Sequence, residues 1–195
     1  MRKITFWIGL CFGLSANAGV FDIPRFVDPD QFAIGVEPVL TLAREEGAGL
    51  GVNAKYTQGY NDWLNFQGII GTGGGPQQFR IGASAIFDFF PDIGKQPGIG
   101  LATQARYVKR PIAGQTEFVA VPYIHKNFYS GNTEFDPFVS FPVGLGLSDG
   151  EAQTLMTFVM GSLFRLSDRF AFVSELGIGV KNTDSYFSGG VTFSH

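Results

Sequence analysis

The feature that most constrains this chain is a two-residue alternation of apolar side chains with small or polar ones, which recurs along most of its length. In the clearest segment, residues 79–87, the odd positions are Phe, Ile, Ala, Ala and Phe, whereas the even positions include Arg80, Gly82 and Ser84. Successive side chains of a β-strand point to opposite faces, so the pattern predicts strands with one apolar face and one small or polar face. Residues 32–42, 49–56, 99–107 and 170–181 follow it too.

Clusters of turn-forming residues divide the alternating region and set the number of strands. They lie at Arg44–Gly47, Gln58–Asp62, Thr72–Gln77, Pro91–Pro97, Lys109–Gln115, Asn127–Asp136, Ser148–Glu151, Ser167–Arg169 and Asn182–Asp184. Nine turns make ten strands, and an even number returns both ends of a single-chain bacterial barrel to one rim. Eight strands are the alternative count.

Two features of the predicted strands depart from a regular alternation. Pro38, Pro122 and Pro142 fall inside them, where each proline removes a ladder hydrogen bond, and they indicate bulges or displaced strand ends. Residues 154–165 are apolar at both parities, so their period is ambiguous.

The chain is poor in charge yet has no long apolar run beyond its first 18 residues. Charged residues make up 16% of it, against about 25% in a typical soluble domain. A transmembrane helix needs about 20 consecutive apolar residues. This combination is typical of a membrane β-barrel. We therefore expect an all-β fold, a closed antiparallel up-and-down transmembrane barrel that occupies residues 31–195 as a single domain.

The first residues have the layout of a secretory signal. Arg2 and Lys3 precede an apolar run, and small residues at positions 15–18 predict cleavage after Ala18. Residues 19–30 are then a short periplasmic segment. Without Arg2 and Lys3, 12 basic residues oppose 17 acidic ones, a net charge of −5 that argues against a nucleic-acid partner. Cys11 is removed with the signal, so no disulfide is expected.

The end of the chain carries a resemblance to a known superfamily. Phe187, Val191 and Phe193 occupy alternating apolar positions in the last ten residues. This ending resembles the last strand of small outer-membrane β-barrel proteins, although Ser194 and His195 follow the final aromatic residue. The resemblance implies a location in the outer membrane of a Gram-negative cell. It also implies contact with outer-membrane lipid, and assembly by the barrel-assembly machinery through this strand.

The polar faces of the predicted strands collect charged residues that would line the lumen as a charge network. These residues are Glu37, Lys55, Arg80, Arg106, Glu117, Glu175 and Lys181. One interpretation is a narrow passive channel whose charges select solutes. The favoured interpretation is a packed interior of paired charges with a structural role, because a small barrel is filled by its own side chains.

Aromatic residues gather beside alternate turns, which lie at one rim of an up-and-down barrel. The predicted girdle consists of Tyr56, Tyr60, Trp63, Phe89, Phe90, Phe128, Tyr129, Phe135, Phe170 and Phe193. Aromatic side chains favour the membrane–water interface, so the girdle supports a membrane location.

Two other classes of protein are alternatives. A soluble periplasmic barrel that binds an apolar ligand, as lipocalins do, would need a Lys- and Glu-rich surface, whereas the polar faces here are mostly Gly, Ala, Ser, Asn and Gln. A lipid-modifying barrel enzyme, such as a lipid A acyl-ester hydrolase, would use His125, but Asn127 and Ser130 do not match the spacing of the deacylase barrels. We therefore predict no catalytic activity, cofactor or metal site.

Overall fold

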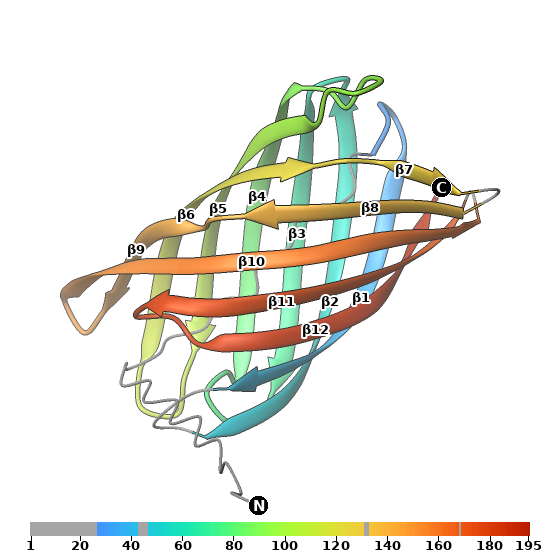
Figure 1. The fold of residues 1–195 in the computed structure, drawn as a ribbon. Coiled ribbons are helices and arrows are strands. Elements are labelled where there is room, and N and C mark those ends of the chain that lie inside the picture. Colours follow the sequence, from blue (N-terminus) through green and yellow to red (C-terminus); the bar gives the residue numbers. More distant parts are fainter. Residues whose placement is uncertain (1–26, 43–46, 131–132, 168) are drawn as a thin grey trace, which may run out of the picture.

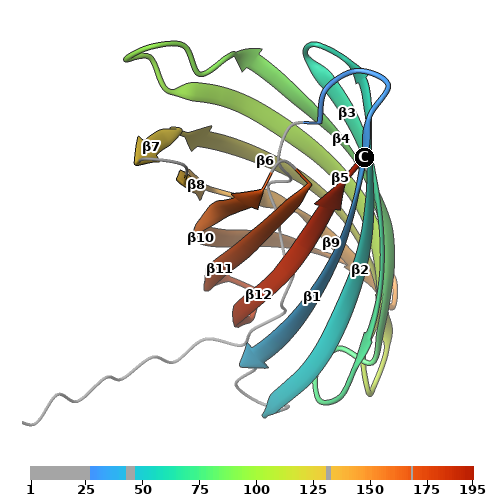
Figure 2. The ribbon, with the colours of Figure 1, turned by 90° about the vertical axis from the view of Figure 1, so that its right-hand side faces the viewer.

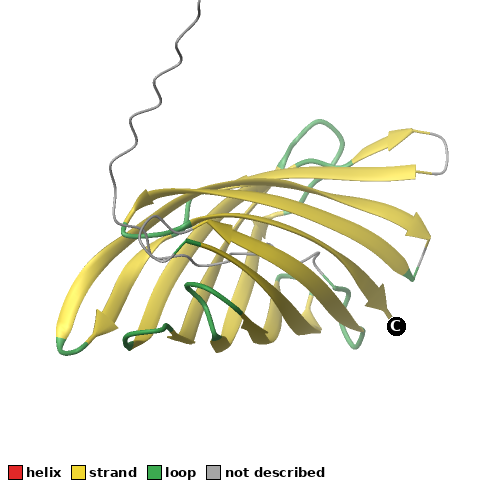
Figure 3. Ribbon diagram, turned by 90° about the horizontal axis from the view of Figure 1, so that it is seen from below, coloured by secondary structure: helices red, strands yellow, loops and turns green. Residues whose placement is uncertain are grey.

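The computed structural model describes residues 27–42, 47–130, 133–167 and 169–195, and its regular elements are all strands (Figure 3). The predicted signal, residues 1–18, and residues 19–26 lie outside the described residues. The described residues form no helix long and apolar enough to cross a membrane. The strands are β1 (Phe32–Leu42), β2 (Ala48–Asn61), β3 (Leu64–Gly73), β4 (Phe79–Phe90), β5 (Gly98–Lys109), β6 (Gly114–His125), β7 (Phe128–Ser130), β8 (Thr133–Ser140), β9 (Val143–Ser148), β10 (Glu151–Ser167), β11 (Phe170–Lys181) and β12 (Ser185–Ser194).

These strands close into an antiparallel barrel of ten, as the alternation and the turns predict (Figure 1). Strands β8 and β9 together occupy one position of the barrel, because both pair with β6 on one side and with β10 on the other. Strand β12 closes the ring between β11 and β1. Each predicted turn overlaps a connection between successive barrel strands.

One predicted turn, Asn127–Asp136, is mostly paired strand. Strand β7 continues β6 in the same register against β8, with Phe128 opposite Phe135 just as His125 lies opposite Phe138. The two arms are bridged at the break by a hydrogen bond from the Lys126 amide to the Pro137 carbonyl. Polar and aromatic residues in this segment resemble a loop in sequence, but they extend the hairpin beyond the end of β6.

The three prolines lie where the ladders are interrupted. Pro142 separates β8 from β9, and across this gap the amide of Phe141 donates to the carbonyl of Pro122. Pro38 pairs with Val52 of β2, whereas no β1–β12 pair is formed at Pro38. A proline nitrogen cannot donate, so each proline occupies a position where the neighbouring strand is not fully paired.

The register around the ring gives the barrel its dimensions. Tracing from each residue to its partner on the next strand, all the way around the barrel, starts at Thr154 on β10 and returns to β10 at Ser167. The two residues are thirteen positions apart, and one of these positions is the extra residue of the bulge between Arg165 and Ser167. The path runs through Leu145, Phe118, Ala105, Ala83, Gly68, Tyr56, Ile34, Phe193 and Phe170. The shear is therefore 12. With strand spacings of about 4.8 Å and a rise of about 3.3 Å per residue, ten strands tilt by about 40° around a backbone cylinder of about 10 Å radius. Figure 2 shows this oblique course.

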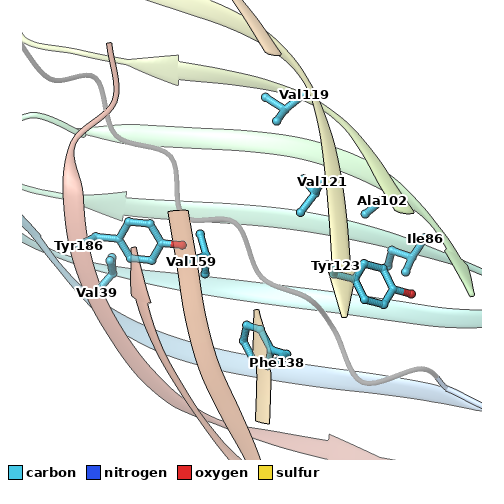
Figure 4. Close-up of a cluster of buried hydrophobic side chains, with 9 residues drawn as sticks. All are labelled: Val39, Ile86, Ala102, Val119, Val121, Tyr123, Phe138, Val159 and Tyr186. Atoms are coloured by element: carbon cyan, nitrogen blue, oxygen red, sulfur yellow. The ribbon is translucent and has the colours of Figure 1, made fainter. Parts of the chain in front are cut away.

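Side chains of both kinds fill the interior. Nine buried apolar residues cluster there, drawn in Figure 4: Val39, Ile86, Ala102, Val119, Val121, Tyr123, Phe138, Val159 and Tyr186. The outward positions carry large apolar side chains that are mostly exposed. Strand β10 is apolar on both faces, because Leu155, Val159 and Leu163 are buried inside while Phe158, Met160 and Phe164 face outward. Because both faces are apolar, residues 154–165 show no clear two-residue alternation in the sequence.

Candidate functional site: the lumen and its two rims

Two ion pairs form the centre of the lumen. Lys55 on β2 donates to Glu37 on β1, and Arg106 on β5 binds Glu117 on β6. The Arg106 Nε and Nη2 atoms lie 2.6 Å and 2.5 Å from the Glu117 Oε2 atom. All four side chains are buried. Adjacent strands thus carry opposite charges. The attraction within each pair offsets part of the free energy lost when its two charged groups are removed from water.

A third carboxylate, Glu175 on β11, is held by a tyrosine rather than by a base. The Tyr186 hydroxyl on β12 donates to the Glu175 Oε1 atom, and both residues are fully buried. Sequence reasoning missed Tyr186, because an aromatic residue at the start of the last strand gives no sign of a carboxylate partner on the neighbouring strand. Lys181, in contrast, is exposed at the last position of β11 and is not brought together with the other six members of the predicted network.

Arg80 on β4 lines the same part of the lumen, and no ion pair of this residue occurs among the described residues. Its side chain is 3% exposed, and its Nε and Nη1 atoms have no hydrogen-bond acceptor among the described residues. It lines a cavity of about 20 Å³ together with Lys55, Gln67, Ser84, Gln104 and Arg106. A space of this size holds about one water molecule. The lumen at this level is therefore occupied by side chains.

At the rim opposite the start of β1 and the end of β12, an ion pair joins two sides of the ring. Arg110 follows β5 and Asp184 precedes β12, and these strands lie five positions apart in a ring of ten. Nevertheless the Arg110 Nη1 atom lies 3.7 Å from the Asp184 Oδ2 atom, and both side chains are buried. The two side chains therefore meet across the lumen at this rim. Sequence reasoning missed this pair because both residues fall in predicted turns.

Aromatic side chains surround the barrel at the rim where β1 begins and β12 ends. Most of the predicted girdle is exposed there, and Phe135 and Phe170 are partly buried. Ring contacts link Phe128 to Phe135 and Phe135 to Phe164, with centroids 6.5 Å and 4.9 Å apart. Others join Phe170 to Phe193, Phe32 to Tyr56, and Trp63 to Phe87. Membrane barrels carry an aromatic belt of this kind at each membrane–water interface.

The final residue continues the outward aromatic series. His195 exchanges backbone hydrogen bonds with Phe32, and the two rings stack with centroids 5.4 Å apart. Residues beyond Phe193 therefore extend the β1–β12 ladder. His195 occupies the outward position that follows Phe193, so the ending still presents a ring at its last residue.

His125, the candidate catalytic residue, is at the same rim. Its Nδ1 atom lies 3.1 Å from both carboxylate oxygens of Asp136 on β8. Sequence reasoning missed Asp136, which it placed in a turn. A carboxylate that orients a histidine is one part of a hydrolytic triad. The side chain of Ser130, the nearest serine in sequence, lies outside the described residues, and no metal-binding group of three acidic, His or Cys side chains occurs among those described.

A salt bridge fixes the loop between β4 and β5 to the β6–β7 junction. Lys126 pairs with Asp92, and the Asn127 amide donates to the Asp92 Oδ2 atom at 2.5 Å. Burial alone would raise the pKa of Asp92. The hydrogen bonds from Lys126 and Asn127, together with the positive charge of Lys126, instead lower this pKa below its ordinary value.

The fold is shared with solved membrane barrels, whereas the sequence has no match. Neither a protein-family model nor a curated protein matches this chain. An outer-membrane channel from Pseudomonas putida F1 is 11% identical, with a TM-score of 0.51 over 90% of this chain and 99% of the channel. A de novo designed transmembrane β-barrel is 12% identical, with a TM-score of 0.42 over 88% of this chain and 100% of the design. LpxR from Salmonella typhimurium is 11% identical, with a TM-score of 0.41 over 84% of this chain and 99% of LpxR.

At these identities the likeness is one of fold. The chain is a closed antiparallel β-barrel with the architecture of an outer-membrane barrel protein. Its own side chains must supply any argument about activity.

Proposed function

We propose that this protein is an outer-membrane β-barrel of a Gram-negative envelope with a structural role and a lumen that is closed at rest. The observation that carries the proposal is the double occlusion of the lumen. Buried ion pairs fill it at one level, and the Arg110–Asp184 pair crosses it at the rim opposite the start of β1. A cylinder of about 10 Å backbone radius leaves little room once long side chains project inward from all sides.

The distribution of apolar residues supports the membrane location. Large apolar side chains such as Leu50, Phe118 and Leu145 are exposed on the outside, while charged ones are buried inside. A soluble barrel that binds an apolar ligand requires the reverse arrangement. The exposed apolar face needs lipid to cover it, since soluble proteins rarely leave so large a patch in water.

Two measurements on the full chain test the proposal. Fractionation of the producing cell should place the protein in the outer membrane, as a band whose gel mobility changes on boiling. Recovery from the soluble periplasm would refute the membrane location.

Conductance then tests closure. In planar lipid bilayers the purified protein should give no regular current steps at neutral pH. The Arg110→Ala/Asp184→Ala double variant, which removes the pair at the rim but keeps the central ion pairs, should also remain closed. Regular steps from the unaltered protein would instead favour the narrow passive channel.

A further inference from the structure

The cavity beside Arg80 has an unusual balance of charge for a buried space. Among the described residues that line it, three are cationic, Lys55, Arg80 and Arg106, and none is acidic. Gln67, Ser84 and Gln104 supply amide and hydroxyl groups that can donate hydrogen bonds. Each polar side chain of the lining can therefore donate to a bound species, and the other lining residues, Ile69, Ile81, Ala83 and Ala105, are apolar.

Arg80 is the residue that requires such a species. Glu37 is bound to Lys55, Glu117 is bound to Arg106, and Glu175 accepts a hydrogen bond from the Tyr186 hydroxyl, so each of these carboxylates already has a donor. A guanidinium group remains charged at any pH a protein tolerates, and an isolated buried charge is costly. The Nε and Nη1 atoms of Arg80 are buried and have no acceptor among the described residues. A hydrogen-bond acceptor in the cavity that carries a negative charge would both balance the charge of Arg80 and accept from its unsatisfied N–H groups.

The size of the cavity selects the acceptor. Its volume of about 20 Å³ admits one water molecule or one monatomic ion and is too small for phosphate, sulfate or a carboxylic acid. Lys55 and Arg106 are neutralised by their glutamates, so the charge of Arg80 is what favours an anion over a neutral water molecule. We infer that the lumen holds one chloride-sized anion, bound by Arg80 together with Lys55 and Arg106.

The direct test is a crystal of the full-length mature protein grown or soaked in molar sodium bromide. An anomalous peak for bromide within hydrogen-bond distance of the Arg80 guanidinium is expected. A cavity that shows only a water molecule, or no density, under these conditions overturns the inference. The proposed closed state does not depend on this result, because the ion pairs occlude the lumen whether or not the cavity holds an anion.

Stability gives a second, independent readout. At constant ionic strength, with gluconate replaced by chloride, each tenfold rise in chloride above its dissociation constant should lower the unfolding equilibrium constant about tenfold. Arg80→Met should abolish this dependence. Lys109→Met, which removes one exposed positive charge from β5, should retain it. A chloride dependence that persists in Arg80→Met, or that is absent from the unaltered protein, contradicts the assigned site.

Discussion

Replacing Glu117 by Gln removes one charge from a buried ion pair while it preserves the size of the side chain. Arg106 would then lose the carboxylate of Glu117 while it stays buried near the cationic Arg80, with its side chain 6% exposed. Opposite charges about 4 Å apart interact by about 4 kcal/mol at an effective dielectric constant of 20. Removing one partner of a buried pair costs about 3–5 kcal/mol in measured cases. We therefore expect Glu117→Gln to lower the free energy of unfolding by about 4 kcal/mol.

Urea unfolding of the purified barrel in lipid vesicles measures this loss. Trp63, the only tryptophan beyond the predicted signal, reports on the transition through its fluorescence. The midpoint should fall while the slope against urea stays constant, since the surface exposed on unfolding is unchanged. Glu151→Gln, which neutralises an exposed carboxylate at the start of β10, should change stability by no more than about 0.5 kcal/mol.

A double variant separates the pair from its surroundings. Arg106→Met combined with Glu117→Leu removes both charges and should cost less than the two single replacements added together, because neither charge is left alone. A loss below about 1 kcal/mol for Glu117→Gln would refute the view that this buried pair stabilises the lumen.

Three further replacements test other parts of the structure. Val36→Arg puts a charge on the outward face near the middle of β1 and should cost about 2–4 kcal/mol in lipid vesicles, whereas Val36→Leu should cost little; equal stability of the two variants would contradict lipid contact at this face. Asp92→Asn should make the loop at 91–97 more sensitive to protease at pH 7. Since the pKa of Asp92 is lowered in the folded state, the stability that this residue contributes is present above its unfolded pKa of about 4 and is lost as the pH falls through the folded value. In acid the two proteins should therefore be equally sensitive to protease. A difference in sensitivity that persists in acid would contradict the salt bridge. His125→Ala should leave the lipid A acylation of the producing cell unchanged, as seen by mass spectrometry, with His195→Ala as the control, and a change specific to His125→Ala would establish the enzyme alternative.

The strand number and the facing of most side chains follow from local chemistry, and for this reason the sequence predicts them. The alternation at residues 79–87 decides which side chains of β4 face the lumen, whatever strand lies beside it. Register is different, because it depends on how all ten strands close. The shear of 12 therefore had to come from the structure, and with it the pairing of Lys55 with Glu37 and of Arg106 with Glu117.

The partners of charged residues in the connections do not follow from the sequence as the facing of strand residues does. Arg110, Asp184 and Asp136 all fall in predicted turns, where a charged side chain is ordinarily solvated. Their partners come from distant strands, so no local pattern indicates them. Lys181 shows the opposite problem, since its parity is that of the lumen but the strand ends there and the side chain reaches solvent. Period alone does not give the depth of a side chain along the barrel.

The two apolar faces of β10 affect how the unfolded chain behaves. Residues 155–160, Leu-Met-Thr-Phe-Val-Met, combine high β-propensity with no charge and no proline, which is the composition of segments that form intermolecular β-structure. In the barrel this strand is paired on both sides, by β8 and β9 and by β11. An unfolded chain presents it unprotected, so aggregation is expected to begin at this segment, more than at the regularly alternating strands, if closure of the barrel is delayed.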